Sequence, residues 1–216
     1  MSCYHPIVGI RTATGVVFES HHRVDGHSIE LPCGRCIGCR MRRASDWSLR
    51  VMHEAQLWPQ NCFVTLTYGT GRLPPNASLD HSDFQKFMKR LRFEFKREVR
   101  FYMCGEYGDV EGRPHYHACL FNVDFRDRKP MGKSGSGELF YDSERLTRLW
   151  SHGIASVQDL TSGTAAYCAR YIMKKTLGDE AEHAYSLVDE DGVLRYRKPP
   201  YAAMSLKPGI GARCLS

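Results

Sequence analysis

Apolar and polar residues recur along this chain at spacings that predict a mixture of helices and strands. The clearest helix is DHSDFQKFMKRLRFEFKR, residues 80–97, in which Phe84, Phe87 and Leu91 belong to one apolar stripe with a helical period. Capping residues and apolar spacing predict further helices at 44–57, 143–150 and 161–178.

Four segments rich in β-branched and aromatic residues read as strands. They cover 61–69, 99–108, 113–123 and 154–160. The second and third flank the short turn GDVEG and are predicted to form an antiparallel hairpin. Gly and Ser predict a flexible loop at 129–138. The pattern predicts an α+β fold with a mainly antiparallel sheet and helices on one side.

Composition narrows the class of protein. The chain has 216 residues, 42% of them hydrophobic and 25% charged, as folded globular proteins do. A net charge of +6 permits a nucleic-acid partner without requiring one. No apolar stretch is long enough to span a bilayer, and the N-terminus lacks the pattern of a secretory signal. Nine cysteines, an odd number with several scattered singly through apolar segments, indicate a reducing compartment and a cytoplasmic protein.

Two histidines stand at the start of the strand RPHYHACLF. Side chains alternate across a strand, so His115 and His117 point to the same face, about 7 Å apart by strand rise. Glu106 lies on the partner strand and shares that face if it pairs with an odd-numbered residue. Two imidazoles and one carboxylate suit Mg²⁺ or Mn²⁺ with open coordination positions. Ordinary histidines at a strand end and a surface Glu106 are the alternative.

The segment YCARYIMKK places Tyr167 and Tyr171 at i and i+4, on one face of a helix. Tyrosines at this spacing are commonly core residues. Here they share the helix with three cations that suit a phosphate-bearing ligand, namely Arg170, Lys174 and Lys175. A phenolate is a competent nucleophile toward a phosphate that a metal polarises.

The segment PCGRCIGCRMRR carries Cys33, Cys36 and Cys39 in two successive C-x-x-C steps. This spacing favours a structural Zn²⁺ site, with Cys3 as the preferred fourth ligand. The competitors for that place are His5, His21, His22 and His27. An Fe–S cluster, redox chemistry and unliganded reduced thiols remain alternatives. The cations that follow are available to DNA phosphates or simply solvated, and they are Arg40, Arg42 and Arg43.

Three segments, FVTLTY (63–68), RPHYHACLF (113–121) and YCARYIMKK (167–175), resemble in their order the three motifs of the HUH endonucleases. With PCGRCIGCR, CGEYG and MSLKPGIG (204–211), the chain is most similar to rolling-circle replication initiators of gokushovirus-type microviruses, which are small single-stranded DNA bacteriophages. The resemblance spans nearly the whole chain, and the order of the motifs makes it specific.

The resemblance implies a central, mainly antiparallel sheet of about five strands with flanking helices and a small N-terminal zinc-knuckle-like region. It implies that His115 and His117 bind a divalent metal with Glu106 as third ligand, and that Tyr167 and Tyr171 are nucleophiles. Single-stranded DNA would be nicked and rejoined at the phage origin through a 5′-phosphotyrosine, leaving a 3′-OH primer. The implied partners are the origin and the host replication machinery, in the host bacterial cytoplasm and without a membrane.

Two departures from the family pattern are present. Arg170 stands where these initiators usually carry Lys, and the chain stops soon after PGIG, where relatives tend to continue. We therefore expect an N-terminal region over 1–60, a nuclease core over 61–178, and a C-terminal segment over 179–216 that is a short variant or a truncated product. The alternatives are a plasmid initiator, relaxase or transposase of the same superfamily, and a non-catalytic zinc-dependent nucleic-acid-binding protein.

Overall fold

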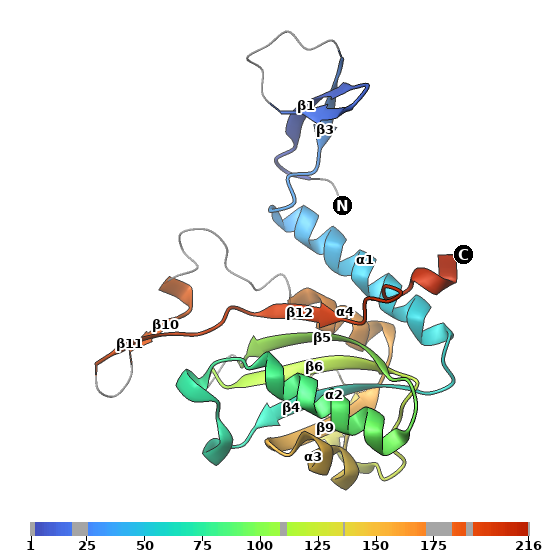
Figure 1. The fold of residues 1–216 in the computed structure, drawn as a ribbon, viewed down its shortest axis with the longest axis vertical. Helices are drawn as coiled ribbons and strands as arrows, with labels where there is room; N and C mark the ends of the chain where they lie inside the picture. The colour runs from blue at the N-terminus through green and yellow to red at the C-terminus, as the bar shows by residue number, and fades with distance from the viewer. Residues whose placement is uncertain are drawn as a thin grey trace. The chain divides into compact units, whose positions relative to one another are not determined.

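The computed structural model describes residues 3–18, 26–108, 112–135, 137–171, 183–188 and 192–215 (Figure 1). The chain divides into two compact units, Met1–Asp46 and Trp47–Ser216. The helices are α1 (Ile37–Gln56), α2 (His81–Phe95), α3 (Glu144–Trp150) and α4 (Ser162–Arg170). The strands are β1 (Ile7–Thr12), β2 (Gly15–Val17), β3 (His27–Leu31), β4 (Asn61–Tyr68), β5 (Arg100–Tyr107), β6 (Pro114–Phe121), β7 (Lys129–Lys133), β8 (Leu139–Asp142), β9 (Gly153–Asp159), β10 (Ser186–Val188), β11 (Leu194–Tyr196) and β12 (Tyr201–Met204).

The second unit is built on a sheet of seven strands in the order β12-β5-β6-β4-β9-β8-β7. Each neighbouring pair is antiparallel. The α+β class and the antiparallel sheet are confirmed, with two strands more than the expected five or so. The strands β4, β5, β6 and β9, which contain the predicted apolar segments, lie in the middle and carry most of the buried core.

Helices cover both faces of this sheet, not one (Figure 1). On the first face α2 buries its predicted stripe against Leu66 and Tyr116, which are fully buried. On the other face α4 packs on β5 and β6, and Trp47 of α1 stacks on Tyr102 with ring centroids 5.3 Å apart. The expectation of helices on one side was wrong because small and apolar residues such as Cys104, Cys119 and Cys168 also close the second face.

Other elements differ from the sequence prediction. The loop predicted at 129–138 begins with β7, which pairs with β8 across a register shift between Pro130 and Gly132. The helix predicted at 44–57 begins earlier, at Ile37, so it contains the last cysteine of the cluster. The short strands β1–β3 and β10–β12 were not predicted, because three to six residues without regular alternation give too weak a period.

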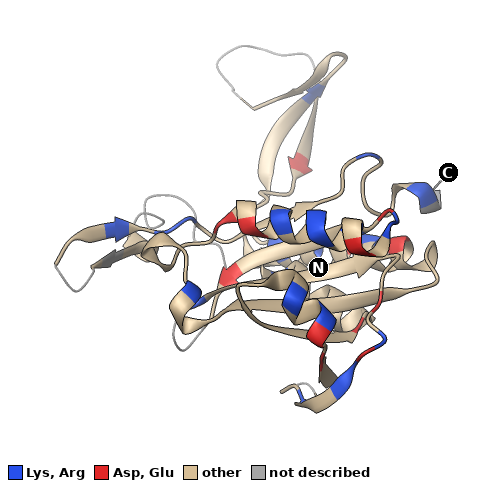
Figure 2. Ribbon diagram, turned by 60° about the horizontal axis from the view of Figure 1, so that its bottom comes forward, with Lys and Arg blue, Asp and Glu red and all other residues tan. Residues whose placement is uncertain are grey.

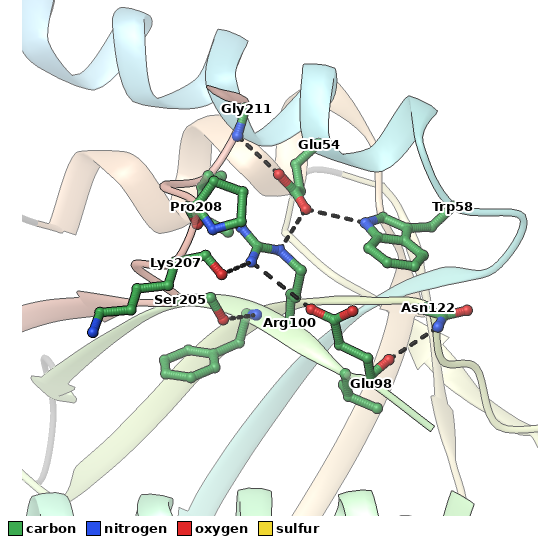
Figure 3. Close-up of polar contacts among 12 residues, drawn as sticks. Glu54, Trp58, Glu98, Arg100, Asn122, Ser205, Lys207, Pro208 and Gly211 are labelled. Carbon is green, nitrogen blue, oxygen red and sulfur yellow. Dashed lines mark hydrogen bonds and ion pairs between the residues drawn. The ribbon is translucent and has the colours of Figure 1, made fainter. Parts of the chain in front are cut away.

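A buried ion pair fastens the C-terminal segment to the sheet (Figure 3). Arg100 Nε donates to Glu54 Oε1 at 2.7 Å, and both side chains are almost completely buried. The second oxygen of Glu54 accepts from the Gly211 N–H at 2.9 Å, and the Arg100 guanidinium also donates to the carbonyl of Pro208 at 2.7 Å. One carboxylate and one guanidinium thereby connect α1, β5 and the loop after β12.

Candidate active site

The hairpin of β5 and β6 brings the two histidines and the glutamate together. Its register pairs Glu106 with His115 and Cys104 with His117, so all three predicted ligands share one face, as the odd-numbered pairing required. Glu106 Oε1 lies 2.9 Å from His115 Nε2 and 3.1 Å from His117 Nε2. Glu106 is 3% exposed and His117 is 4% exposed. The three ligand atoms lie within 4.8 Å of one another, which is close enough to share one ion.

The far side of each imidazole is held by a neighbour. His115 Nδ1 lies 2.9 Å from the carbonyl oxygen of Arg113, and His117 Nδ1 lies 3.0 Å from the hydroxyl of Thr65. A carbonyl only accepts, so Nδ1 of His115 carries a proton and a neutral ring turns its Nε2 lone pair toward Glu106. A lone pair facing a carboxylate at hydrogen-bond distance calls for a cation between them.

Glu106 offers a further position to such a cation. Its Oε2 atom is buried and accepts no hydrogen bond of ordinary geometry from the described residues. Burial by itself would raise the pKa of Glu106, but the hydrogen bonds and charges of His115 and His117 outweigh it and lower the pKa to about 2. The carboxylate is therefore ionised at physiological pH. Two imidazoles and a carboxylate with an unsatisfied oxygen fit a divalent metal ion.

The two tyrosines lie over this centre. Thr161 caps α4 with its side chain and forms a capping box with Thr164, so the helix starts where the sequence predicted. One turn apart on that helix, the rings of Tyr167 and Tyr171 lie 5.0 and 5.2 Å from the ring of His117. The Tyr171 hydroxyl donates a hydrogen bond to the Tyr167 hydroxyl.

The tyrosines differ in their surroundings. Tyr167 is 37% exposed, whereas Tyr171 is 9% exposed. Burial, the hydrogen bond to Tyr167 and the charge of Glu106 all raise the pKa of Tyr171 above the usual tyrosine range. The more accessible hydroxyl is thus the one that accepts a hydrogen bond from its neighbour.

The predicted phosphate-binding cations are partly placed. Arg170 is exposed at the end of α4, and it lines a cavity of about 360 Å³ together with Tyr167 and His117. Lys174 and Lys175 lie outside the described residues. Lys and Arg elsewhere are mixed with Asp and Glu along the ribbon, as Figure 2 shows, so a strongly basic patch does not mark the site by itself.

The first unit brings the predicted cysteines together. The Sγ atoms of Cys3, Cys33, Cys36 and Cys39 lie within 4.8 Å of one another, from the chain before β1, the loop after β3 and the first turn of α1. Backbone N–H groups of Tyr4, Cys33, Cys36 and Cys39 point at sulfur atoms 3.3–3.5 Å away. Four converging sulfurs fit a tetrahedral Zn²⁺ site. His5 and His27 do not belong to this group, and His21 and His22 lie outside the described residues.

The backbone prepares two of these thiols for ionisation. The N–H groups of Tyr4 and Cys39 lower the pKa of Cys36 to about 6, and those of Cys36 and Arg35 lower the pKa of Cys33. Burial and the other thiols raise the pKa of Cys39 to about 12. The cations expected to follow the cluster lie on α1, where Arg42 and Arg43 are exposed and Arg40 is half-buried.

Some residues of the site escaped sequence reasoning. Thr65 and Phe63 face His117 across the β4–β6 pair, and Phe63 stacks on the imidazole with centroids 5.7 Å apart. The alternation of FVTLTY contained the signal, since Phe63, Thr65 and Thr67 share a face. Gln158 and Glu138 line the same cavity as His117, and no local pattern marked them.

A family model for replication-associated proteins of the ORF2 type matches residues 61–176. The chain is 36% identical over 196 residues to the replication-associated protein VP4 of Bdellovibrio phage phiMH2K, covering 86% of this chain and 62% of that protein. It is 36% identical over 171 residues to the replication-associated protein ORF2 of Spiroplasma virus 4, with 74% and 52% covered. It is 32% identical over 165 residues to the replication-associated protein ORF4 of Chlamydia phage 1, with 73% and 41% covered.

These relatives come from microviruses, which confirms the resemblance found in the sequence. The chain spans between 41% and 62% of their lengths. No solved structure matches it. Among the described helices, none has the length and apolar character that crossing a bilayer requires.

Proposed function

This chain belongs to the ORF2-type family of replication-associated proteins, and from that premise we propose that it initiates rolling-circle replication of a phage genome. It nicks single-stranded DNA at the origin and rejoins the ends, using a tyrosine nucleophile and a divalent metal. The origin and the host replication machinery are its partners in the bacterial cytoplasm. The observation that carries the proposal is the position of both tyrosine rings, within 5.2 Å of a histidine of the His–His–Glu cluster.

Glu106, His115 and His117 would hold the catalytic Mg²⁺ or Mn²⁺. When bound, that ion supplies charge that polarises the scissile phosphate and stabilises the negative charge of the transition state. Thr65 and the Arg113 carbonyl keep the two imidazoles turned toward it, as partners beyond the ligands do in other metal sites.

The Tyr167 hydroxyl oxygen attacks the phosphorus, and the bond between phosphorus and O3′ breaks. The new ester is a 5′-phosphotyrosine, and the phenolic proton ends on O3′, which becomes the free primer terminus. Arg170, exposed beside Tyr167, holds a phosphate of the same strand. Tyr171 cuts the regenerated origin after one round, so the held strand end is joined to the new 3′-OH and a circle is released.

The four cysteines of the first unit would hold a structural Zn²⁺. The thiolates already accept backbone N–H bonds, which stabilise negative charge on sulfur before any ion binds. The ion would fix the start of α1, from which Arg42 and Arg43 project as contacts for DNA phosphates.

The direct test is a denaturing gel with 3′-labelled single-stranded DNA fragments covering the replicon that encodes the chain. With Mn²⁺ or Mg²⁺, label is expected to comigrate with the protein, because the 5′ side of the cut fragment is esterified to tyrosine. The adduct should disappear in EDTA and in the variants His117→Ala and Tyr167→Phe/Tyr171→Phe.

Absence of an adduct on every fragment, with DNA binding and metal content intact, would reject the nuclease and favour a zinc-dependent DNA-binding protein. The similarity to phage proteins favours a phage initiator over a plasmid initiator, relaxase or transposase.

A further inference from the structure

The cavity beside the metal cluster has a built interior that the nicking chemistry leaves without a role. It measures about 360 Å³ and lies between β4, β9, the start of α4 and the turn that joins β7 to β8. This volume is at the low end of the range for small-molecule pockets, roughly 300–1,000 Å³, and suits a single planar ring system. His117 and Tyr167 form one side of it, so its occupant lies next to the reacting phosphate.

The walls combine aromatic and amide groups. Phe63 and Tyr167 meet edge to face with centroids 6.1 Å apart and supply the apolar surface. Gln158 stands opposite Phe63 in the β4–β9 register, and its side-chain amide makes no hydrogen bond with the described residues. An amide that both donates and accepts, set in a partly closed aromatic pocket, is suited to the edge of a heterocycle.

The opposite wall carries a carboxylate. Glu138 Oε1 accepts a hydrogen bond from the Thr161 hydroxyl at 3.1 Å, which fixes the side chain against the start of α4. Gly163 makes room for it, because a Cβ there would lie 2.9 Å from the same oxygen. A fixed carboxylate accepts from amino groups and offers nothing to carbonyl oxygens. Arg170 at the rim makes no ion pair among the described residues and can meet a phosphate.

We propose that this cavity binds one unpaired nucleobase of the strand being cut, adjacent to the scissile phosphate, with Gln158 and Glu138 reading its hydrogen-bonding edge. The inference rests on the proposed nicking function and names how that site selects its sequence. Because Glu138 only accepts, bases with an exocyclic amino group fit the pocket, and thymine fits it least. Base pairing would occupy the edge that is read, so the pocket selects single strands.

The test measures base preference without chemistry. Binding of fluorescent single-stranded oligonucleotides is followed by anisotropy in EDTA, with each position around the preferred sequence replaced in turn by all four bases. The variants are Gln158→Leu and Glu138→Gln, and Gln85→Leu is the matched amide-removal control, exposed on α2 over the opposite face of the sheet.

Wild type and Gln85→Leu are expected to bind thymine about 5- to 100-fold more weakly than the best base at one position, the range that one paired base contact supplies. In Gln158→Leu this ratio should fall below about threefold at that position and persist at the others. An unchanged ratio at every position in both pocket variants overturns the inference, as does a wild type without any base preference. Since binding is measured without metal or cleavage, this outcome does not depend on whether the DNA adduct forms.

Discussion

The phenol ring of Tyr171 lies nearly parallel to the imidazole of His117, with centroids 5.2 Å apart and an angle of 17° between the planes. This stacking covers Tyr171 and directs its hydroxyl to Tyr167. The two tyrosines are therefore not equivalent, although they occupy equivalent places in the sequence motif.

Tyr167 is expected to make the first cut, because it is exposed whereas burial raises the pKa of Tyr171. Tyr167→Phe should lower the initial rate of adduct formation by on the order of 10⁴-fold, as loss of a covalent nucleophile does. Tyr171→Phe should retain the first adduct and lose strand joining. Single-turnover gels with 3′-labelled DNA measure both steps. First adduct lost in Tyr171→Phe and kept in Tyr167→Phe would reverse the assignment.

Removing the Thr65 hydroxyl should weaken metal binding although Thr65 is not a ligand. Without it, Nδ1 of His117 loses its hydrogen-bond partner and the ring its fixed orientation. Thr65→Val should reduce Mn²⁺ affinity by about 10- to 100-fold, the usual cost of losing such a partner. Electron paramagnetic resonance titration of free Mn²⁺ measures the affinity. Thr67→Val, on the same strand face, is the control, and an equal loss there would show a general effect on β4.

Zinc content should depend on Cys3 and not on the neighbouring His5. Elemental analysis of purified protein is expected to give one zinc per chain for wild type and His5→Ala. Cys3→Ser should lose most of it, because four sulfurs converge here and a hydroxyl is a poor zinc ligand. Retained zinc in Cys3→Ser together with loss in His5→Ala would exchange the fourth ligand.

The Arg100–Glu54 pair should matter for stability far more than an exposed pair. Arg100→Ala leaves Glu54 buried without its cation and is expected to lower the free energy of unfolding by about 3–5 kcal/mol. Lys129→Ala, which removes an exposed pair with Glu144, should cost no more than about 1 kcal/mol. Urea titration measures both, and comparable losses would contradict the burial argument.

The same carboxylate predicts a pH dependence. Burial alone would raise the pKa of Glu54, but hydrogen bonds from Gly211, Trp58 and Arg100 lower it below its unfolded value. The folded state therefore binds fewer protons than the unfolded state. Its contribution is complete above the unfolded carboxyl pKa of about 4.3 and is lost as the pH falls below that value. Glu54→Gln should flatten this acid limb in unfolding experiments between about pH 5 and 3, and an unchanged slope would refute the assignment.

The metal cluster could be predicted from the sequence because side-chain alternation is strict. Once β5 and β6 pair, Glu106 and His115 have to share a face, and only the register remained open. The β7–β8 hairpin was missed because Gly132 and a register shift disguise its alternation. Gln158 and Glu138 come together only through tertiary packing, from segments about twenty residues apart whose local pattern says nothing about the cavity.

The separation of these groups along the chain also sets an order of assembly. Glu106 and His115 are nine residues apart and belong to one hairpin, so closing that loop costs little chain entropy. Tyr171 lies 54 residues beyond His117, and it reaches the site only after β9 has been added to the sheet. A nascent chain would therefore be able to capture a metal ion before it acquires the groups that attack DNA, and cleavage competence would appear last during folding.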